Sequence, residues 1–333
     1  MGEEYRKMCD KHGHGASGGS EVGQLLSDAP SNWGRWGPTD EVGSLNFLTN
    51  LEVLRGVRAV RQGKVFTCGE VIGNPNGDPL WPGRAPAKRE TMIDKDSYVR
   101  GDLPSLPGGA EFTDDRIEMF LQGSTQFDAL GHVWYDDKLW NGYPSSDTNG
   151  GLKNASILPI SERGVVGRGV LLDMAAYKGK PFLDKGDLLH LEDLLGCAEQ
   201  QQVKIEKHDI LCLRLGFLQL LRVQGPETFY KDFLEPGLTY SPELVAWFHE
   251  MEIPCLATDT ISNETELDPA IGVQIPLHCA LMRNLGIAFN EVCNFEALNK
   301  DCHADGQWDF LYAAAPLKVT EATGAPVNVL AIK

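Results

Sequence analysis

The sequence predicts a single α/β domain built on an irregular mixed sheet. Residues 116–129 alternate almost strictly between apolar and polar side chains, which indicates a strand with one apolar face. Short β-like runs at 169–172 and 210–215 are interleaved with helical runs at 191–202 and 242–251, as in α/β folds. The 36 glycines among 333 residues favour tight turns and long ordered loops over a helical bundle.

Residues 1–30 differ from the rest of the chain in composition. They are rich in Gly, Ser and His and show no periodicity, which predicts a flexible N-terminal arm ahead of one catalytic domain over 31–333. Within that domain, Thr49 or Asn50 can cap a helix predicted from residue 51 to residue 62. Residues 74–110 contain many Pro and Gly residues, and we expect long loops there that carry a binding function.

The net charge and the spacing of the cysteines indicate the kind of partner and the cellular compartment. The formal net charge of −17 disfavours a nucleic-acid partner, because the chain would repel phosphate. No apolar stretch is long enough to cross a membrane, and the first residues lack an apolar signal core. Eight cysteines are scattered without C-x-x-C spacing, several of them in apolar runs, as expected in a reducing compartment. We therefore expect a cytoplasmic protein whose partner is a small molecule.

The polar face of the strand predicted over 116–129 is the first candidate site. Gln122, Ser124, Gln126 and Asp128 project to one side, about 7 Å from one to the next. His132 follows beyond a glycine, so that a carboxylate, two carboxamides and an imidazole can converge at the end of the strand. A solvent-facing strand followed by a structural histidine would show the same spacing, and this spacing alone does not decide between the two.

A second candidate lies in the C-terminal third. Pro276 suits the start of a helix, leucines repeat every four residues, and Gly286 ends it, so His278 falls in the first turn. A β-like run over 287–290 then leads to Glu291. Taken alone, the histidine also fits a hydrogen-bonded core position, and the glutamate fits an exposed surface position. The sequence contains no dinucleotide fingerprint, no phosphate-binding loop and no G-x-S-x-G nucleophile motif.

Together, several short motifs connect these candidates to a known family. Residues 122–132 read QGSTQFDALGH, and 140–142 read WNG. Further matching pieces lie at 33–46, 169–173, 209–216, 257–260 and 323–328. The chain resembles the cyclase family of metal-dependent amidohydrolases, which includes bacterial kynurenine formamidase and isatin hydrolase. Members of that family carry the motif H-x-G-T-H-x-D-x-x-x-H. Its longer members carry the related motif H-G-x-T-Q-W-D-A-L-G-H. The resemblance spans roughly residues 33–333.

The resemblance implies a swivelling β/β/α fold, a divalent metal and hydrolysis of an amide. In the family, the first two histidines and the aspartate of the motif bind metal, which corresponds here to Gln122, Gln126 and Asp128. The more distant His278 and Glu291 correspond to further ligands, and His132 to a ligand or an acid/base. Gln126 matches the longer members, whereas Gln122 departs from both patterns.

We therefore predict a hydrolase that acts on a small cyclic or aromatic amide or lactone. His132, Asp128 and Glu291 are the predicted catalytic residues. The predicted substrate wall is aromatic and consists of Trp36, Trp81 and Phe127. Two other functions remain open because of the glutamines. One is a metal-independent lyase, dehydratase or cyclase that uses His132 and Asp128 as acid and base, and the other is a binding protein without activity.

The glutamines also affect the predicted metal. A carboxamide offers a neutral oxygen where histidine would offer nitrogen, so an oxygen-rich site favours manganese over zinc. The alternative is that no ion binds and that Gln122 and Gln126 contact the substrate directly. We also expect a homodimer or homotetramer, because related enzymes associate and closed symmetric assemblies are the usual solution.

Overall fold

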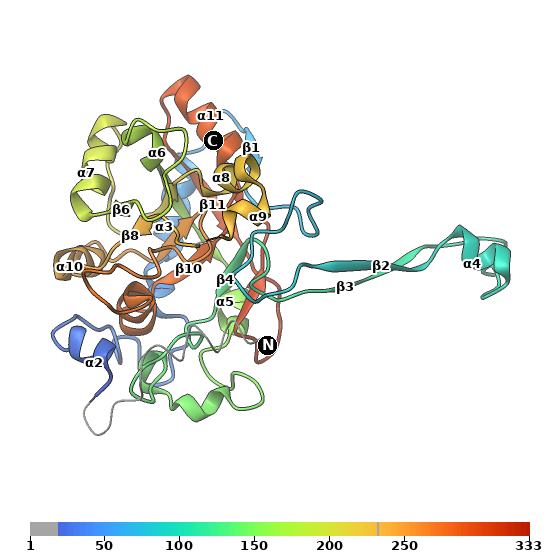
Figure 1. Ribbon diagram of the computed structural model, residues 1–333, viewed down its shortest axis with the longest axis horizontal. Coiled ribbons are helices and arrows are strands. Elements are labelled where there is room, and N and C mark those ends of the chain that lie inside the picture. The colour runs from blue at the N-terminus through green and yellow to red at the C-terminus, as the bar shows by residue number, and fades with distance from the viewer. Residues whose placement is uncertain (1–18, 232) are drawn as a thin grey trace.

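The computed structural model describes residues 19–231 and 233–333 and contains a nine-stranded mixed sheet (Figure 1). The strand order is β1-β13-β11-β5-β7-β9-β10-β4-β12. The strands are β1 (Val65–Thr67), β4 (Gln126–Asp128), β5 (Val165–Asp173), β7 (Ile210–Arg214), β9 (Cys255–Thr258), β10 (Ala288–Glu291), β11 (Asp309–Ala314), β12 (Gly324–Pro326) and β13 (Leu330–Ile332). Strands β5, β7, β9 and β10 are parallel, and the flanking strands run antiparallel. The predicted α/β fold with a mixed sheet is confirmed.

Helices cover the sheet, as expected for parallel strands that are buried on both faces. They are α2 (Glu21–Leu25), α3 (Asn50–Arg58), α5 (Ile157–Arg163), α6 (Met174–Tyr177), α7 (Leu191–Gln200), α8 (Phe217–Gln224), α9 (Pro226–Phe229), α10 (Pro242–Glu250) and α11 (Glu296–Asp305). Short 3₁₀ turns lie at Gly43–Phe47, Trp140–Gly142 and Ser145–Thr148, and β6 (Leu188–Leu189) pairs with β8 (Gly237–Leu238). The central strands are almost fully buried in the main core, and a second, smaller apolar cluster lies around α8 and α9.

Local sequence signals explain several of these elements. Thr49 caps α3 through its side chain, and the Glu52 carboxylate accepts a hydrogen bond from the backbone amide of Thr49, which completes a capping box. Helix α3 lies directly on β5, because a Cβ atom on Gly56 would stand 2.6 Å from the backbone of Gly167. The helices predicted at 191–202 and 242–251 are confirmed as α7 and α10, each within two residues of its predicted end.

The sheet curls so that the segment after its first strand approaches the strands near its other edge. The amide of Glu70 donates to Thr125 Oγ1 at 2.7 Å, and the amide of Asn294 donates to the carbonyl of Cys68 at 2.8 Å. Thr125 immediately precedes β4, and Asn294 follows β10. The curl therefore brings the loop after β1 next to the strands that carry the candidate site residues.

Residues 88–118 form an arm that projects far from the domain, with α4 (Lys95–Arg100) at its tip (Figure 1). Its two strands, β2 (Lys88–Ile93) and β3 (Asp114–Glu118), pair only with each other. The prediction of long loops throughout 74–110 is therefore wrong for the part that lies in the arm.

The single strand predicted over 116–129 is also wrong. The chain leaves β3 and turns at Gly123, whose amide bonds the carbonyl of Phe120, before β4 begins in the main sheet.

Part of the predicted N-terminal arm is folded. Residues 1–18 lie outside the described part of the chain, but α2 follows them and Leu26 is buried in the core. The seven cysteines among the described residues are buried and unpaired, as predicted. Across the described ranges, no helix is both long and apolar enough to span a membrane.

Candidate metal centre and its cavity

Three buried side chains from separate segments meet at one point. Asp128 ends β4 and Glu291 ends β10, while His278 begins the π-helix η4 (His278–Asn284). Strands β4 and β10 are antiparallel neighbours, with Gln126 opposite Glu291. One ligand atom from each of Asp128, His278 and Glu291 lies within 4.8 Å of the others. This spacing allows all three atoms to contact one metal ion.

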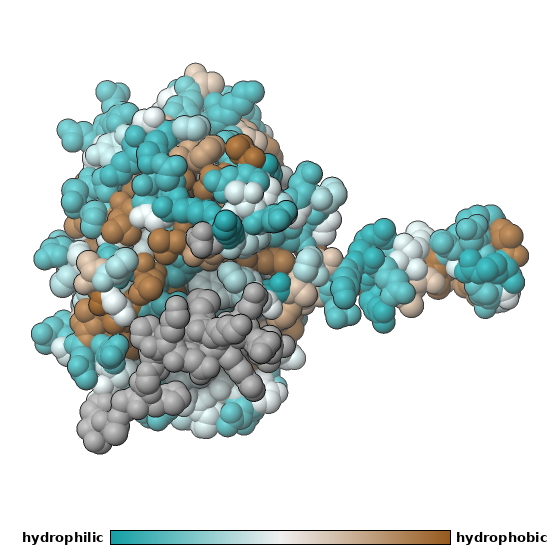
Figure 2. Space-filling model, viewed as in Figure 1, coloured by the Kyte–Doolittle hydropathy of each residue, from teal (hydrophilic) through white to brown (hydrophobic). Residues whose placement is uncertain are grey.

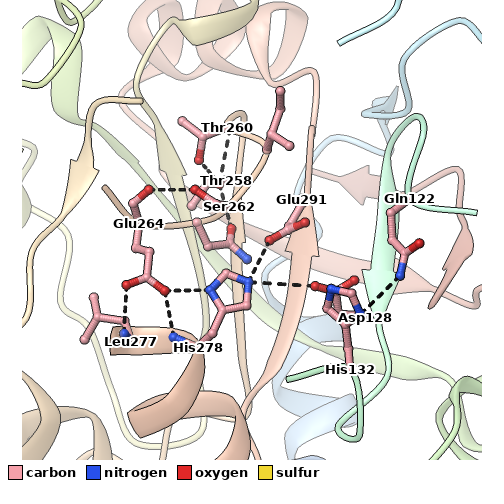
Figure 3. Close-up of polar contacts among 12 residues, drawn as sticks. Gln122, Asp128, His132, Thr258, Thr260, Ser262, Glu264, Leu277, His278 and Glu291 are labelled. Carbon is pink, nitrogen blue, oxygen red and sulfur yellow. Dashed lines mark hydrogen bonds and ion pairs between the residues drawn. The ribbon is translucent and has the colours of Figure 1, made fainter. Parts of the chain in front are cut away.

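His278 is held so that one ring nitrogen faces the two carboxylates (Figure 3). Its Nε2 atom lies 3.5 Å from Glu291 Oε1 and 3.9 Å from Asp128 Oδ2. On the other side of the ring, Nδ1 lies 2.5 Å from Glu264 Oε1. Glu264 also accepts hydrogen bonds from the amides of Leu277 and His278, each at 2.7 Å, and so caps the helix that carries the imidazole.

Several oxygens at this point lack a partner. Asp128 Oδ1, Glu291 Oε1 and Gln126 Oε1 are buried and accept no hydrogen bond within the described part of the chain. Leaving buried polar atoms unpaired is costly, and oxygen atoms of this kind are the donors that hard divalent cations prefer. The donor set therefore fits a metal ion held by Asp128, His278 and Glu291.

The electrostatics of the cluster lead to the same conclusion. Burial raises the pKa of Glu291, and the neighbouring carboxylate of Asp128 raises it further. Burial alone would lower the pKa of His278, but the hydrogen bond to Glu264 and the negative charges of Glu264 and Glu291 outweigh burial and raise it. Without another cation the cluster retains protons to limit the repulsion. A divalent ion would supply the same compensation and release those protons.

The two motif glutamines contact different residues of the site. Gln126 Nε2 donates to Glu291 Oε2, so this carboxamide fixes the glutamate from the neighbouring strand. Gln122 Nε2 donates to Thr323 Oγ1 at 3.1 Å and lies 3.5 Å from His132 Nδ1. Gln126 thus contacts the candidate ligand Glu291, whereas Gln122 lies beside the imidazole of His132.

A cavity of about 430 Å³ opens onto this centre, within the usual range for small-molecule sites. It is lined by Trp81, Pro82, Gly83, Arg84, Phe120, Asp128, His132, Val133, Trp134, Ile261, Ser262, Ile275, His278 and Glu291. Burial lowers the pKa of His132, against the opposing effect of Asp128. A neutral imidazole at ordinary pH is suited to accept a proton from water.

Comparison with known proteins places this site in a family. Residues 65–265 match the Cyclase family, described as "Putative cyclase". The chain belongs to the cyclase family. A solved structure described as a novel cyclase is 34% identical, with a TM-score of 0.83 over 91% of this chain and 100% of that one. No curated protein matched.

More distant solved structures share the fold. Isatin hydrolase A from Ralstonia solanacearum is 21% identical, with a TM-score of 0.60 over 86% of this chain and 98% of that one. Isatin hydrolase A from Labrenzia aggregata, bound to benzyl benzoate, is 20% identical, with a TM-score of 0.57 over the same shares. The predictions that the chain is a cyclase-family protein and an enzyme are confirmed.

The structure brings most of the predicted site residues of this cyclase together, but not all. Asp128, His132, His278, Glu291 and Gln126 converge, and Trp81 lines the cavity. Phe127 is fully buried, because it lies between two strand residues that face the centre and so points the opposite way. Trp36 packs instead on Phe47 and Trp140. The structure therefore brings neither Phe127 nor Trp36 to the cavity.

Sequence reasoning missed Glu264 and Arg84. Glu264 lies in an irregular segment rich in acidic residues, and no periodicity distinguishes it from its neighbours. Arg84 falls in the Pro- and Gly-rich stretch, where only its neighbour Trp81 was singled out. Both residues reach the site through long-range contacts that local sequence patterns do not encode.

A second cavity, of about 480 Å³, lies away from this centre. It is lined by Thr67, Gly69, Glu70, Val71, Ile72, Ser124, Thr125, Ala315, Leu317, Pro326, Val327 and Asn328. The single ionisable side chain in that lining, Glu70, is paired with Arg222. We therefore assign the chemistry to the cavity that contains His132.

Proposed function

We propose that this cyclase-family enzyme hydrolyses a small cyclic or aromatic amide or lactone with the help of a divalent metal ion. One observation carries the proposal: three buried ligand atoms within 4.8 Å of one another face a cavity that also contains His132. The aromatic side chains of Trp81, Phe120 and Trp134 line the same cavity and suit a flat ring.

The residues divide into clear roles. Asp128, His278 and Glu291 would hold the ion, which when bound polarises a carbonyl and makes water more acidic. His132 accepts the proton from the attacking water and returns it to the leaving nitrogen or oxygen. Gln122 lies beside this base, with its Nε2 atom 3.5 Å from the ring Nδ1. Because the ring is neutral at ordinary pH, it can begin the cycle as a base.

The donor atoms favour manganese or magnesium over zinc. Two of the three ligands are carboxylates, so oxygen donors predominate in the set. Zinc sites in proteins are usually richer in nitrogen and sulfur donors. The metal identity is part of this proposal, as is the choice of an amide or a lactone.

The test combines metal removal with two substitutions. The purified protein is analysed for metals, treated exhaustively with a chelator, and assayed with added manganese, zinc or none on a panel of cyclic and aryl amides and lactones that includes isatin. We expect activity to disappear on chelation and to return best with manganese. His132→Ala should lower kcat/KM at least about 100-fold, the usual contribution of a general base. Asp128→Ala should also abolish most of the activity, because it removes one of the three metal ligands.

Two controls make the result specific. His249→Ala removes an imidazole on α10 that lies outside the cavity lining, and it should leave the rate unchanged. The double variant Gln122→His/Gln126→His restores nitrogen donors and should shift the metal preference toward zinc. Full activity without any metal would instead support a metal-independent lyase, dehydratase or cyclase. Stoichiometric, tight zinc in the native protein would contradict the ligand argument.

A further inference from the structure

The cavity holds one positively charged side chain that the proposed chemistry does not use. Among the residues that line it, Arg84 is the only lysine or arginine. The other ionisable side chains in the lining are two carboxylates, Asp128 and Glu291, and two imidazoles, His132 and His278. A divalent ion would neutralise the two carboxylates, so the loaded cavity would retain the charge of Arg84 as its net charge.

Two backbone carbonyls hold Arg84 in place, but they occupy only one nitrogen of its guanidinium. Its amide donates to the carbonyl of Trp81 at 3.0 Å, which closes a turn at the cavity wall. Its Nη1 atom donates to the carbonyl of Gln122 at 2.8 Å, so the guanidinium is anchored to the first residue of the motif. This anchor orients the side chain and leaves the remaining N–H groups of the guanidinium available.

Among the described residues, Arg84 also lacks a carboxylate partner, in contrast to Arg168 and Arg214. Arg168 and Arg214 each pair with two carboxylates. Within residues 19–231 and 233–333, no carboxylate oxygen lies within 4.0 Å of the Arg84 guanidinium, and its Nε and Nη2 atoms make no hydrogen bond. A partly buried guanidinium with free donors is a typical site for a planar anion.

Arg84 lines the same cavity as His132 and the three candidate metal ligands. The aromatic side chains of Trp81, Phe120 and Trp134 line the cavity beside it. A ring placed between these walls would present a ring substituent to the guanidinium and the scissile bond to His132.

We propose that Arg84 binds the carboxylate of an aromatic ligand. The carboxylate is either a substituent of the substrate or the acid that hydrolysis releases. The reaction that uses this carboxylate rests on the function proposed above, but the binding of an aromatic carboxylate does not.

Binding without turnover provides the test. Calorimetric titrations of benzoate and of its neutral isostere benzamide are made on the full chain, both after chelation and with manganese. Wild-type protein should bind benzoate more tightly than benzamide. Arg84→Gln should weaken benzoate binding about tenfold or more, the usual effect of losing a charge-assisted hydrogen bond, with benzamide unchanged. Arg84→Lys should be intermediate, because lysine keeps the charge and loses the planar fork.

The controls separate folding and metal effects. Arg89→Gln removes an arginine on the exposed arm and should change neither affinity. Unchanged benzamide binding shows that the Arg84→Gln cavity is intact. Equal benzoate affinity in Arg84→Gln and wild type, with binding lost on chelation, would identify the ion as the anchor and overturn the proposal. These titrations measure binding and do not depend on turnover. They remain valid if no hydrolysis is found, so the two proposals can fail separately.

A kinetic comparison distinguishes the two sources of the carboxylate. If the substrate carries it, Arg84→Gln raises KM for acid-bearing aryl amides and leaves their neutral analogues unaffected. If hydrolysis releases it, Arg84→Gln weakens inhibition by product and leaves KM unchanged. No change in either quantity would contradict the assignment of Arg84.

Discussion

At the scale of single residues, Glu264 determines how His278 can act. The carboxylate accepts from Nδ1 of the imidazole and from two backbone amides, and its side chain is 1% exposed. A proton on Nδ1 leaves the lone pair of Nε2 free to face Asp128 and Glu291. A carboxylate behind a metal-binding histidine fixes both the tautomer and the ring orientation in this way.

We therefore expect Glu264→Gln to weaken metal binding about 10- to 100-fold. Leu277 donates to Oε2, whereas the amide and Nδ1 of His278 share Oε1. Glutamine retains only one acceptor oxygen, so its NH₂ group leaves either the amide of Leu277 or both groups of His278 without an acceptor. Titration of the chelated protein with manganese, followed by calorimetry, measures the affinity directly. Asp268→Asn is the matched control, since this carboxylate is also buried and bonds Thr239 and Ala270 instead. Equal manganese affinity in Glu264→Gln and wild type would exclude the orienting role.

The site residues that could be predicted from the sequence are those that a local pattern marks. Asp128 and His132 lie within one contiguous motif, and His278 and Glu291 follow recognisable element boundaries. Phe127 was assigned to the substrate wall through its place in the same motif, although strand alternation turns it into the core. Glu264 and Arg84 act through contacts that depend on the tertiary fold, so no local pattern indicated them.

At the scale of elements, Asp173 connects several segments. It ends β5, caps α6 through the amide of Ala176, and accepts hydrogen bonds from Arg214 on β7 and from Asn299 and His303 on α11. Burial alone would raise its pKa, but the hydrogen bond from His303 and the charge of Arg214 outweigh burial and lower it. The ionised carboxylate therefore stabilises the packing of α11 against the parallel strands.

Asp173→Asn should lower the free energy of unfolding at pH 7 by about 2 kcal/mol, as for loss of hydrogen bonds to a charged group. A lowered folded-state pKa means that this stabilisation is complete above the unfolded pKa of about 3.9 and is lost as the pH falls through the folded value. Denaturant unfolding should thus show a difference that shrinks below about pH 4. Asp184→Asn, at an exposed ion pair, should have little effect. A difference that persists unchanged at low pH would contradict this account.

Elements with strong local signals were predictable, and those shaped by tertiary contacts were not. The capping box of α3 and the apolar runs of β5 and β7 specify their own conformation. The alternation over 116–129 spans two different sheets, because a turn at Gly123 redirects the chain between them. Alternation reports which side chains share a face, but it does not reveal that the strand is interrupted.

At the scale of the whole molecule, the arm formed by residues 88–118 projects away from the domain, which does not cover it (Figure 2). Charged residues of its strands pair across the hairpin, as in Arg89–Asp115 and Arg116–Glu90. Its apolar side chains remain exposed, and they are Met92, Val99, Leu106, Phe112 and Ile117. A two-stranded hairpin is only marginally stable by itself, and exposed apolar side chains on such an element favour association.

We therefore expect the chain to form a homodimer or homotetramer in which the arm contacts a second copy. Light scattering at micromolar concentration should give a multiple of the 36.6 kDa of one chain. Val99→Lys combined with Phe112→Lys places charges on the arm and should shift the mass toward one chain, because burying unpaired charges at an interface is costly. Val223→Lys on α8 is the matched control, since Val223 is 72% exposed and Val99 73%. A wild-type mass of one chain would contradict the expectation, and an unchanged mass in the arm variant would exclude the arm as the contact.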